Sequence, residues 1–163
     1  MKLAICPGSF DPITMGHLDI IKRAASIFDK VVVMVMINAK KTKSCLFTAQ
    51  ERVELIKRAT ADIPNVSVEF SEKLLAHLAE EKGECVVVKG LRVISDFESE
   101  FQMALINRRL NKKLETIFLP TSEEYLYLSS SLVKEVCSLG GDISEFVPSE
   151  ILQDVQNKLV GGV

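Results

Sequence analysis

The sequence predicts an α/β fold, a doubly wound five-stranded parallel sheet of Rossmann-like topology with helices on both faces. Short apolar runs alternate with amphipathic stretches along the chain, and the run 31–37 is apolar on both faces, as a central parallel strand is. Parallel strands joined in this way require right-handed crossovers and a sheet that is covered on both sides. The expected strands are residues 3–6, 31–37, 66–70, 86–88 and 116–119.

Helices are expected between these strands and after the last one. Thr48 with Glu51 and Ser95 with Glu98 are capping-box pairs, each opening a stretch with helical spacing. Two glycines at 140–141 would end a helix that starts at a run of three serines. The expected helices are residues 16–28, a stretch from 48, a shorter one within 71–82, a stretch from 95, 129–139 and a last one after Pro148.

Length and composition limit the classes of function. The 163 residues fit one domain spanning 1–163, and 47% hydrophobic with 26% charged residues is typical of a globular chain. A net charge of -2 gives no general attraction for nucleic acid, so we expect no nucleic-acid partner and a local site for any bound anion.

We expect a cytoplasmic protein. The run 31–37 is the longest apolar one and is far too short to cross a bilayer, and the first residues read as a strand and not as a signal peptide. The four cysteines are far apart and form no C-x-x-C pair, so we expect reduced thiols and no protein-held metal.

The expected fold restricts where a ligand can bind. In doubly wound sheets, ligands lie beyond the carboxyl ends of the strands, at the point where the strand order reverses. In the usual order that point lies between the first and fourth strands. The chemistry is therefore expected in two loops, residues 7–17 and residues 89–95.

The first loop contains a phosphate-binding pattern. Gly8 allows close approach of the backbone and Ser9 supplies a hydroxyl. Thr14-x-Gly16-His17 opens a helix whose first amides and dipole favour an anion, and His17 can donate a hydrogen bond to a phosphoryl oxygen. The tetrapeptide alone also fits a helix start with a solvated histidine, but its place after the first strand and after Gly-Ser-Phe-Asp-Pro favours the functional interpretation.

The second loop places two cations around a glycine. It reads Lys89-Gly90-Leu91-Arg92, directly after the fourth expected strand. Arg92 can contact a phosphate through two N–H groups, whereas Lys89 acts as a point charge. The alternative is that both cations only solubilise a strand end, which the expected proximity to Ser9 and His17 disfavours.

Two further segments can reach an oligophosphate. Ser129, Ser130 and Ser131 at a helix start would present amides and hydroxyls together, although serine is also simply a good N-cap. The basic run 40–43 follows the second strand at the same edge of the sheet. We select Lys41 as the lysine that reaches a transferring phosphate and take its neighbours as solvated.

These motifs together resemble the phosphopantetheine adenylyltransferases, within the T/H-x-G-H nucleotidyltransferase superfamily. The resemblance rests on Pro-Gly-Ser-Phe-Asp-Pro-x-x-x-Gly-His, Lys-Gly-Leu-Arg and Ser-Ser-Ser-Leu-Val-Lys-Glu, with Phe-Thr-x-x-Glu-Arg at 47–52 and Asp-Phe-Glu-x-Glu at 96–100. It runs over residues 3–146. The chain departs from the family by Ser9 in place of threonine, by Lys89 in place of arginine, and by a basic run about two residues longer.

The resemblance implies transfer of the adenylyl group of ATP to 4′-phosphopantetheine, giving dephospho-coenzyme A and pyrophosphate. The acceptor's second phosphate pKa is about 6, so a largely dianionic monoester could attack the α-phosphorus without a general base. Magnesium would accompany ATP. Homohexamer formation and feedback binding of coenzyme A are also implied by the family. We expect no membrane partner. The family further implies the following site residues. Catalysis would involve His17, Ser9, Lys41 and Arg92; phosphopantetheine would contact Ser9, Lys41, Leu75 and Lys89; ATP would contact Ser9, Phe10, His17, Gly90, Leu91, Arg92, Glu100, Tyr125, Leu126, Tyr127, Leu128, Ser129, Ser130 and Ser131.

Two alternatives stay open. One is another nucleotidyltransferase, which uses nicotinamide mononucleotide as acceptor or CTP with a polyol phosphate. The other is a catalytically silent module that senses ATP or coenzyme A. The intact set of Ser9, His17 and Arg92 argues against the silent module, because a sensor has no need of a donor aimed at the α-phosphate.

Overall fold

A computed structural model describes residues 2–38, 44–92 and 94–160, and it contains the expected parallel sheet. The strand order is β3-β2-β1-β4-β5, and every neighbouring pair is parallel. All the expected strands are confirmed, with small shifts of their ends, and the reversal lies between the first and fourth strands as expected. Their bounds are β1 Leu3–Gly8, β2 Lys30–Met36, β3 Val66–Ser71, β4 Cys85–Leu91 and β5 Glu115–Pro120.

The helices lie where the periodicity placed them. The capping box at α2 is confirmed, because the Glu51 amide donates to Thr48 Oγ1 at 3.2 Å and the Thr48 amide donates to Glu51 at 2.7 Å. Short 3-10 turns, η2 Glu123–Tyr125 and η3 Ser149–Ile151, precede the last two helices. The helices are α1 Met15–Ile27, α2 Ala49–Ala59, α3 Leu75–Lys82, α4 Ile94–Leu110, α5 Ser130–Ser138 and α6 Leu152–Val160.

The expected capping box at Ser95 is wrong. Helix α4 already begins at Ile94, so Ser95 lies inside the helix and is not its cap. The guanidinium of Arg92 pairs with the Asp96 carboxylate across this junction, which ties the end of β4 to the first turn of the helix. This ion pair joins residues four apart and links the strand end directly to the helix start.

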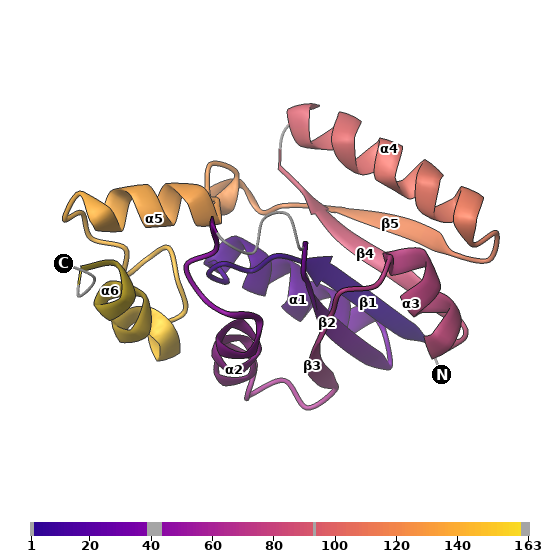
Figure 1. Cartoon of the computed structure of the whole chain (residues 1–163), viewed down its shortest axis with the longest axis horizontal. Helices are drawn as coiled ribbons and strands as arrows, with labels where there is room; N and C mark the ends of the chain where they lie inside the picture. Colours follow the sequence, from indigo (N-terminus) through magenta and orange to yellow (C-terminus); the bar gives the residue numbers. More distant parts are fainter. Residues whose placement is uncertain (1, 39–43, 93, 161–163) are drawn as a thin grey trace.

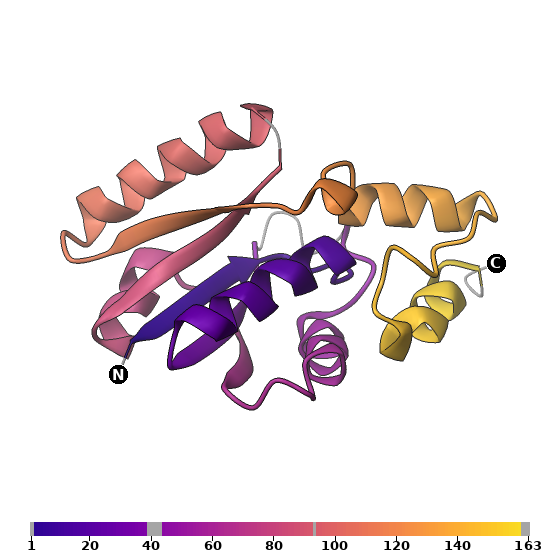
Figure 2. The same cartoon turned by 180° about the vertical axis from the view of Figure 1, so that it is seen from behind.

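Both faces of the sheet are buried at the central strands β1 and β2, which explains their continuous apolar runs. On β1, Ala4 and Cys6 face one core cluster and Ile5 faces the other. Helices α1 and α2 cover the first face, and α3 and α4 lie on the other (Figures 1 and 2). Helices α5 and α6 lie beyond the carboxyl ends of the strands (Figure 1). Within the described residues, no helix is both long enough and apolar enough to span a membrane.

Candidate active site

A cleft of about 350 Å³ opens where the order of the strands reverses. Strand β1 pairs with β4 through Leu3–Cys85, Ala4–Val86 and Ile5–Val87, so the loops that follow these strands meet. The prediction that the two loops meet is confirmed by this geometry. The cleft is lined by Cys6, Pro7, Gly8, Ser9, Phe10, Thr14, Gly16, His17, Ile20, Ile21, Val88, Lys89, Gly90, Arg92, Asp96, Glu100, Thr121, Leu128, Ser129, Ser130 and Ser131.

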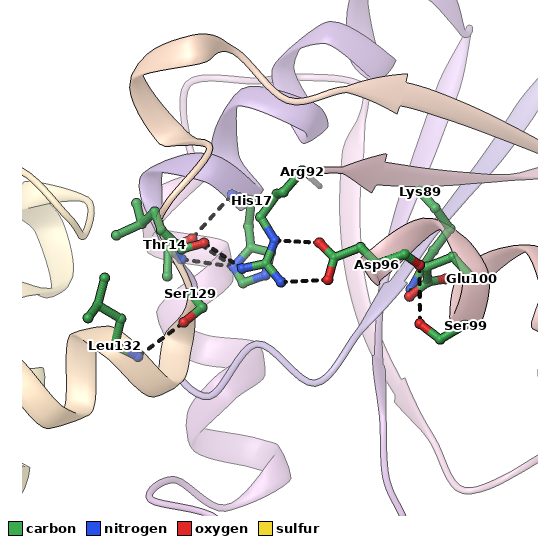
Figure 3. Close-up of polar contacts among 10 residues, drawn as sticks. Thr14, His17, Lys89, Arg92, Asp96, Ser99, Glu100, Ser129 and Leu132 are labelled. Carbon is green, nitrogen blue, oxygen red and sulfur yellow. Dashed lines mark hydrogen bonds and ion pairs between the residues drawn. The ribbon is translucent and has the colours of Figure 1, made fainter. Parts of the chain in front are cut away.

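His17 is held in one orientation by the residue that caps its own helix. Thr14 is the N-cap of α1, and its Oγ1 accepts from the His17 amide at 3.3 Å. In return the Thr14 amide donates to His17 Nδ1 at 3.0 Å (Figure 3). Because Nδ1 is an acceptor, the proton of the neutral ring lies on Nε2. The capping box thus leaves one N–H donor on the other side of the imidazole.

The surroundings of His17 favour its neutral form. Burial, together with the nearby positive charges of Arg92 and Lys89, lowers the pKa of His17 from 6.5 to about 4. At neutral pH the ring is therefore a fixed hydrogen-bond donor in a cleft that also holds two cations, and it is not itself a cation. Such a preorganised donor suits a site where negative charge develops in a transition state.

Phe10 and Gly8 shape the floor of the cleft. Phe10 has a φ of 48°, and its ring lies edge-on to His17 with 5.1 Å between centroids. A Cβ on Gly8 would approach this ring to 2.9 Å. The sequence assigned Gly8 to close approach of a ligand; in this structure it also gives the Phe10 ring the space that it needs.

Both cations of the second loop are paired with carboxylates of α4 (Figure 3). Lys89 Nζ lies 3.1 Å from Glu100 Oε1. Arg92 makes two bonds to Asp96, at 2.8 and 3.2 Å, and its Nη1 donates to the Leu128 carbonyl at 2.7 Å. These contacts fix the cations at the rim of the cleft and attach β4 to the segment that leads into α5.

The serine-rich start of α5 forms the opposite wall. Ser129 caps the helix, because its Oγ accepts from the Leu132 amide at 3.1 Å. Ser130 donates its hydroxyl to the Pro12 carbonyl at 2.7 Å. The first amides of a helix have no acceptor within the helix, so this end favours an anion in the cleft.

Some predicted site residues lie elsewhere. Leu75 starts α3 and packs against the core cluster on the other face of the sheet, and Leu91 ends β4 opposite Pro120. In the 125–127 segment, Tyr125 packs against the main core, whereas Tyr127 is exposed and meets Phe146 edge-on. None of these residues, nor Leu126, lines the cleft, so their contacts with substrates stay predictions. Lys41 lies outside the described residues.

Sequence reasoning missed several residues that line the cleft. Ile20 lies one turn after His17, a spacing that could have revealed it, and Asp96 is four residues after Arg92. Cys6 also lines the cleft, but burial raises the pKa of its thiol to about 12, so it is not a thiolate nucleophile. Across residues 2–38, 44–92 and 94–160, no group of three His, Cys, Asp or Glu side chains could hold a metal ion.

Comparisons with known proteins agree with this geometry. Residues 5–136 match the cytidylyltransferase-like family. A phosphopantetheine adenylyltransferase of Caldanaerobacter subterraneus subsp. tengcongensis is 54% identical over 97% of this chain and 98% of its own. The protein of that name from Rubrobacter xylanophilus is 54% identical over 96% and 94% of the two chains, and the one from Clostridium novyi is 52% identical over 98% of each.

A solved structure has the same fold as this chain. The crystal structure of a putative nicotinate-nucleotide adenylyltransferase from Vibrio parahaemolyticus matches with a TM-score of 0.72, over 96% of this chain and 99% of that one. Its sequence identity is only 18%, so it supports the nucleotidyltransferase fold and no particular substrate. From its sequence relatives, this chain belongs to the cytidylyltransferase-like family and, within it, to the phosphopantetheine adenylyltransferases.

Proposed function

We propose that this protein transfers the adenylyl group of ATP to the phosphate of 4′-phosphopantetheine, releasing pyrophosphate. One structural observation supports this proposal independently of the sequence relatives. A neutral histidine, with its donor N–H fixed by Thr14, lies in one cleft with two cations. This arrangement suits a reaction in which one phosphate attacks another, because charge accumulates on phosphoryl oxygens and no strong base is needed.

In the proposed step, an oxygen of the acceptor phosphate forms a bond to the α-phosphorus of ATP. The bond between the α-phosphorus and the bridging oxygen of the β-phosphate breaks, and the electron pair leaves with pyrophosphate. The acceptor is largely dianionic at neutral pH and needs no proton removed. His17 would donate from Nε2, and Ser9 from its hydroxyl, to the oxygens that gain charge.

The substrates would be shared between the two walls of the cleft. Lys89 would pair with the acceptor phosphate, and Arg92 with the amides at the start of α5 would hold the phosphates of ATP. Glu100, which now pairs with Lys89, would be free to contact ATP once the acceptor phosphate takes its place. Roles for Lys41, Leu75, Leu91 and the 125–127 segment remain part of the proposal.

Mg²⁺ would enter with ATP, coordinated by phosphate oxygens and water, as is usual for this ion. It would neutralise the pyrophosphate that leaves. Lys89 replaces the fork of an arginine by a single ammonium, so we propose weaker acceptor binding with the same reaction. We further propose that the protein acts in the cytoplasm and that coenzyme A, which contains the product's groups, competes for this cleft.

We also propose that the protein is a homo-oligomer, a hexamer by analogy with the family, that buries the outer side of α4. This helix exposes an apolar set whose members are 44–55% exposed: Phe97, Phe101, Met103, Leu105, Ile106 and Leu110. Several large apolar side chains exposed on one helix are typical of an interface between protein chains. Sedimentation of the wild type against Phe101→Asp, with Leu139→Asp as an exposed control on another element, tests this; a monomeric wild type would contradict it.

The function is tested by measuring pyrophosphate release from ATP and Mg²⁺ with 4′-phosphopantetheine, with nicotinamide mononucleotide as the control acceptor. Release that depends on phosphopantetheine is expected. Release with only the control acceptor would keep the site but change the substrate, and silence with both acceptors would favour a nucleotide-binding module. His17→Ala, which leaves both cations in place, is the matched control for contaminating activity.

A further inference from the structure

Asp11 is a buried carboxylate next to the cleft that the proposed reaction does not use. It lies two residues after Ser9 and is only 5% exposed. Its Oδ1 accepts from the Phe47 amide at 2.8 Å, and its Oδ2 accepts from the Leu46 amide at 2.9 Å. Burial of a carboxylate is costly unless its charge is compensated, so a compensating partner is expected.

That partner comes from α5. Lys134 Nζ lies 3.1 Å from Asp11 Oδ2, and the lysine side chain is itself largely covered. Lys134 is one helical turn after Ser130, which donates to the Pro12 carbonyl at 2.7 Å. Residues four apart lie on the same side of a helix. One side of α5 is therefore attached to residues 11–12 at two points, of which one is an ion pair.

The ion pair lies close to the proposed nucleotide site. Asp11 and Lys134 border a smaller cavity of about 190 Å³, and this cavity shares Ser9, Ser130 and Ser131 with the main cleft. The loop that carries Asp11 and the helix that carries Lys134 therefore both also contribute residues to the cleft. A shift of α5 along this contact would move its serines relative to Ser9.

We propose that Asp11 and Lys134 are a positioning pair for ATP, which sets the place of the α5 serines against the Ser9–His17 loop. This inference rests on the proposed function. Displacements of about 1 Å are enough to weaken preorganised contacts with phosphate strongly. The acceptor's main contact would be affected less, because Lys89 lies on β4 and is held by Glu100 and not by this pair.

Lys134→Met tests the proposal, with ATP binding measured by calorimetry in Mg²⁺ and steady-state kinetics measured alongside. The Kd for ATP is expected to rise about tenfold, within the range of coupling between residues in contact. The KM for phosphopantetheine should stay within about twofold. Lys134→Arg keeps the charge and should restore ATP binding. Lys73→Met, which removes an exposed ion pair with Glu81 on α3, is the matched control and should bind ATP like the wild type.

Asp11→Asn gives a second series. The double variant with Lys134→Met should lose less ATP affinity than the two single losses combined, because both changes break the same pair. If Asp11→Asn does not fold, the Lys134 series decides alone. Wild-type ATP affinity in Lys134→Met, equal weakening of both substrates, or no rescue by Lys134→Arg would each overturn the proposal. ATP binding needs no turnover, so a wild type that binds ATP without releasing pyrophosphate would refute the proposed function and leave this test valid.

Discussion

Acidification should destabilise this protein through His17, whose ring is neutral when the chain is folded. The pKa of His17 is lowered from 6.5 to about 4 by burial, Arg92 and Lys89, so the unfolded chain takes up the proton first as the pH falls. The stability from the neutral ring is complete above the unfolded pKa and is lost as the pH falls toward the folded pKa. Between about pH 8 and pH 5, the unfolding free energy should fall by about 2 kcal/mol on account of this residue.

Urea unfolding at both pH values measures this loss, at one protein concentration because self-association would add to stability. His17→Gln is the informative variant, since glutamine at this position can accept from the Thr14 amide and keep the capping box without titrating. It should lose about 2 kcal/mol less than the wild type between the two pH values. His77→Gln, an exposed change on α3 that keeps His17, should behave like the wild type. Equal losses in wild type and His17→Gln would refute the assignment of a neutral donor.

Four other changes have defined outcomes. His17→Ala should lower kcat by roughly two to three orders of magnitude, the scale for one preorganised donor, and Ser9→Ala should lower it less because backbone amides remain; the reverse order would contradict the roles assigned. Gly90→Ala would place a Cβ 2.8 Å from Ile20 Cγ1, so it should destabilise the fold by about 1–3 kcal/mol in chemical unfolding, and an unchanged unfolding free energy would argue against this packing. Arg92→Lys keeps the charge but cannot keep both bonds to Asp96 or make a two-bond contact with a phosphate of ATP. The KM for ATP should therefore rise about tenfold, with little change in melting temperature. An unchanged KM would show that the two-bond contact of Arg92 is not needed for ATP binding.

The sequence was sufficient for the sheet and for the location of the cleft. Strands β1 and β2 are apolar on both faces because both faces are buried, and this pattern is visible without coordinates. Once the strand order follows the usual topology, the loops after β1 and β4 must meet, and the cations of the second loop come to lie beside His17. The serine cap of α5 was predictable because capping is local.

The residues that hold the cleft together were less accessible to sequence reasoning. Asp11 and Arg52 each bond to backbone atoms: Asp11 accepts from Leu46 and Phe47, and Arg52 donates to the Ser9 carbonyl at 2.8 Å. A backbone partner at a distance of 35 to 43 residues leaves no pattern in side-chain types. The capping box at Thr14 was also missed, because its reciprocal partner is a histidine in place of the usual glutamate or glutamine.

The exposed apolar side chains of α4 are a further difference. Helical spacing of apolar residues after Ser95 predicted a helix, and α4 is confirmed. The same spacing usually means that the apolar side faces the chain's own core. Here Phe97, Phe101 and Leu105 are 44–55% exposed, although the Phe97 ring meets Phe118 of β5 edge-on. Periodicity identifies the helix but does not say what covers it.

The central claim, direct transfer of an adenylyl group to the acceptor phosphate, is tested most directly by following the acceptor's own oxygens. Phosphopantetheine carrying a heavy oxygen isotope in its phosphate would be incubated with ATP, Mg²⁺ and the enzyme. The isotope content of each product would then be measured by mass spectrometry. Attack of this phosphate on the α-phosphorus predicts that all of the label is in dephospho-coenzyme A and none is in pyrophosphate. Label in the released phosphates, or release of ADP in place of pyrophosphate, would contradict the account.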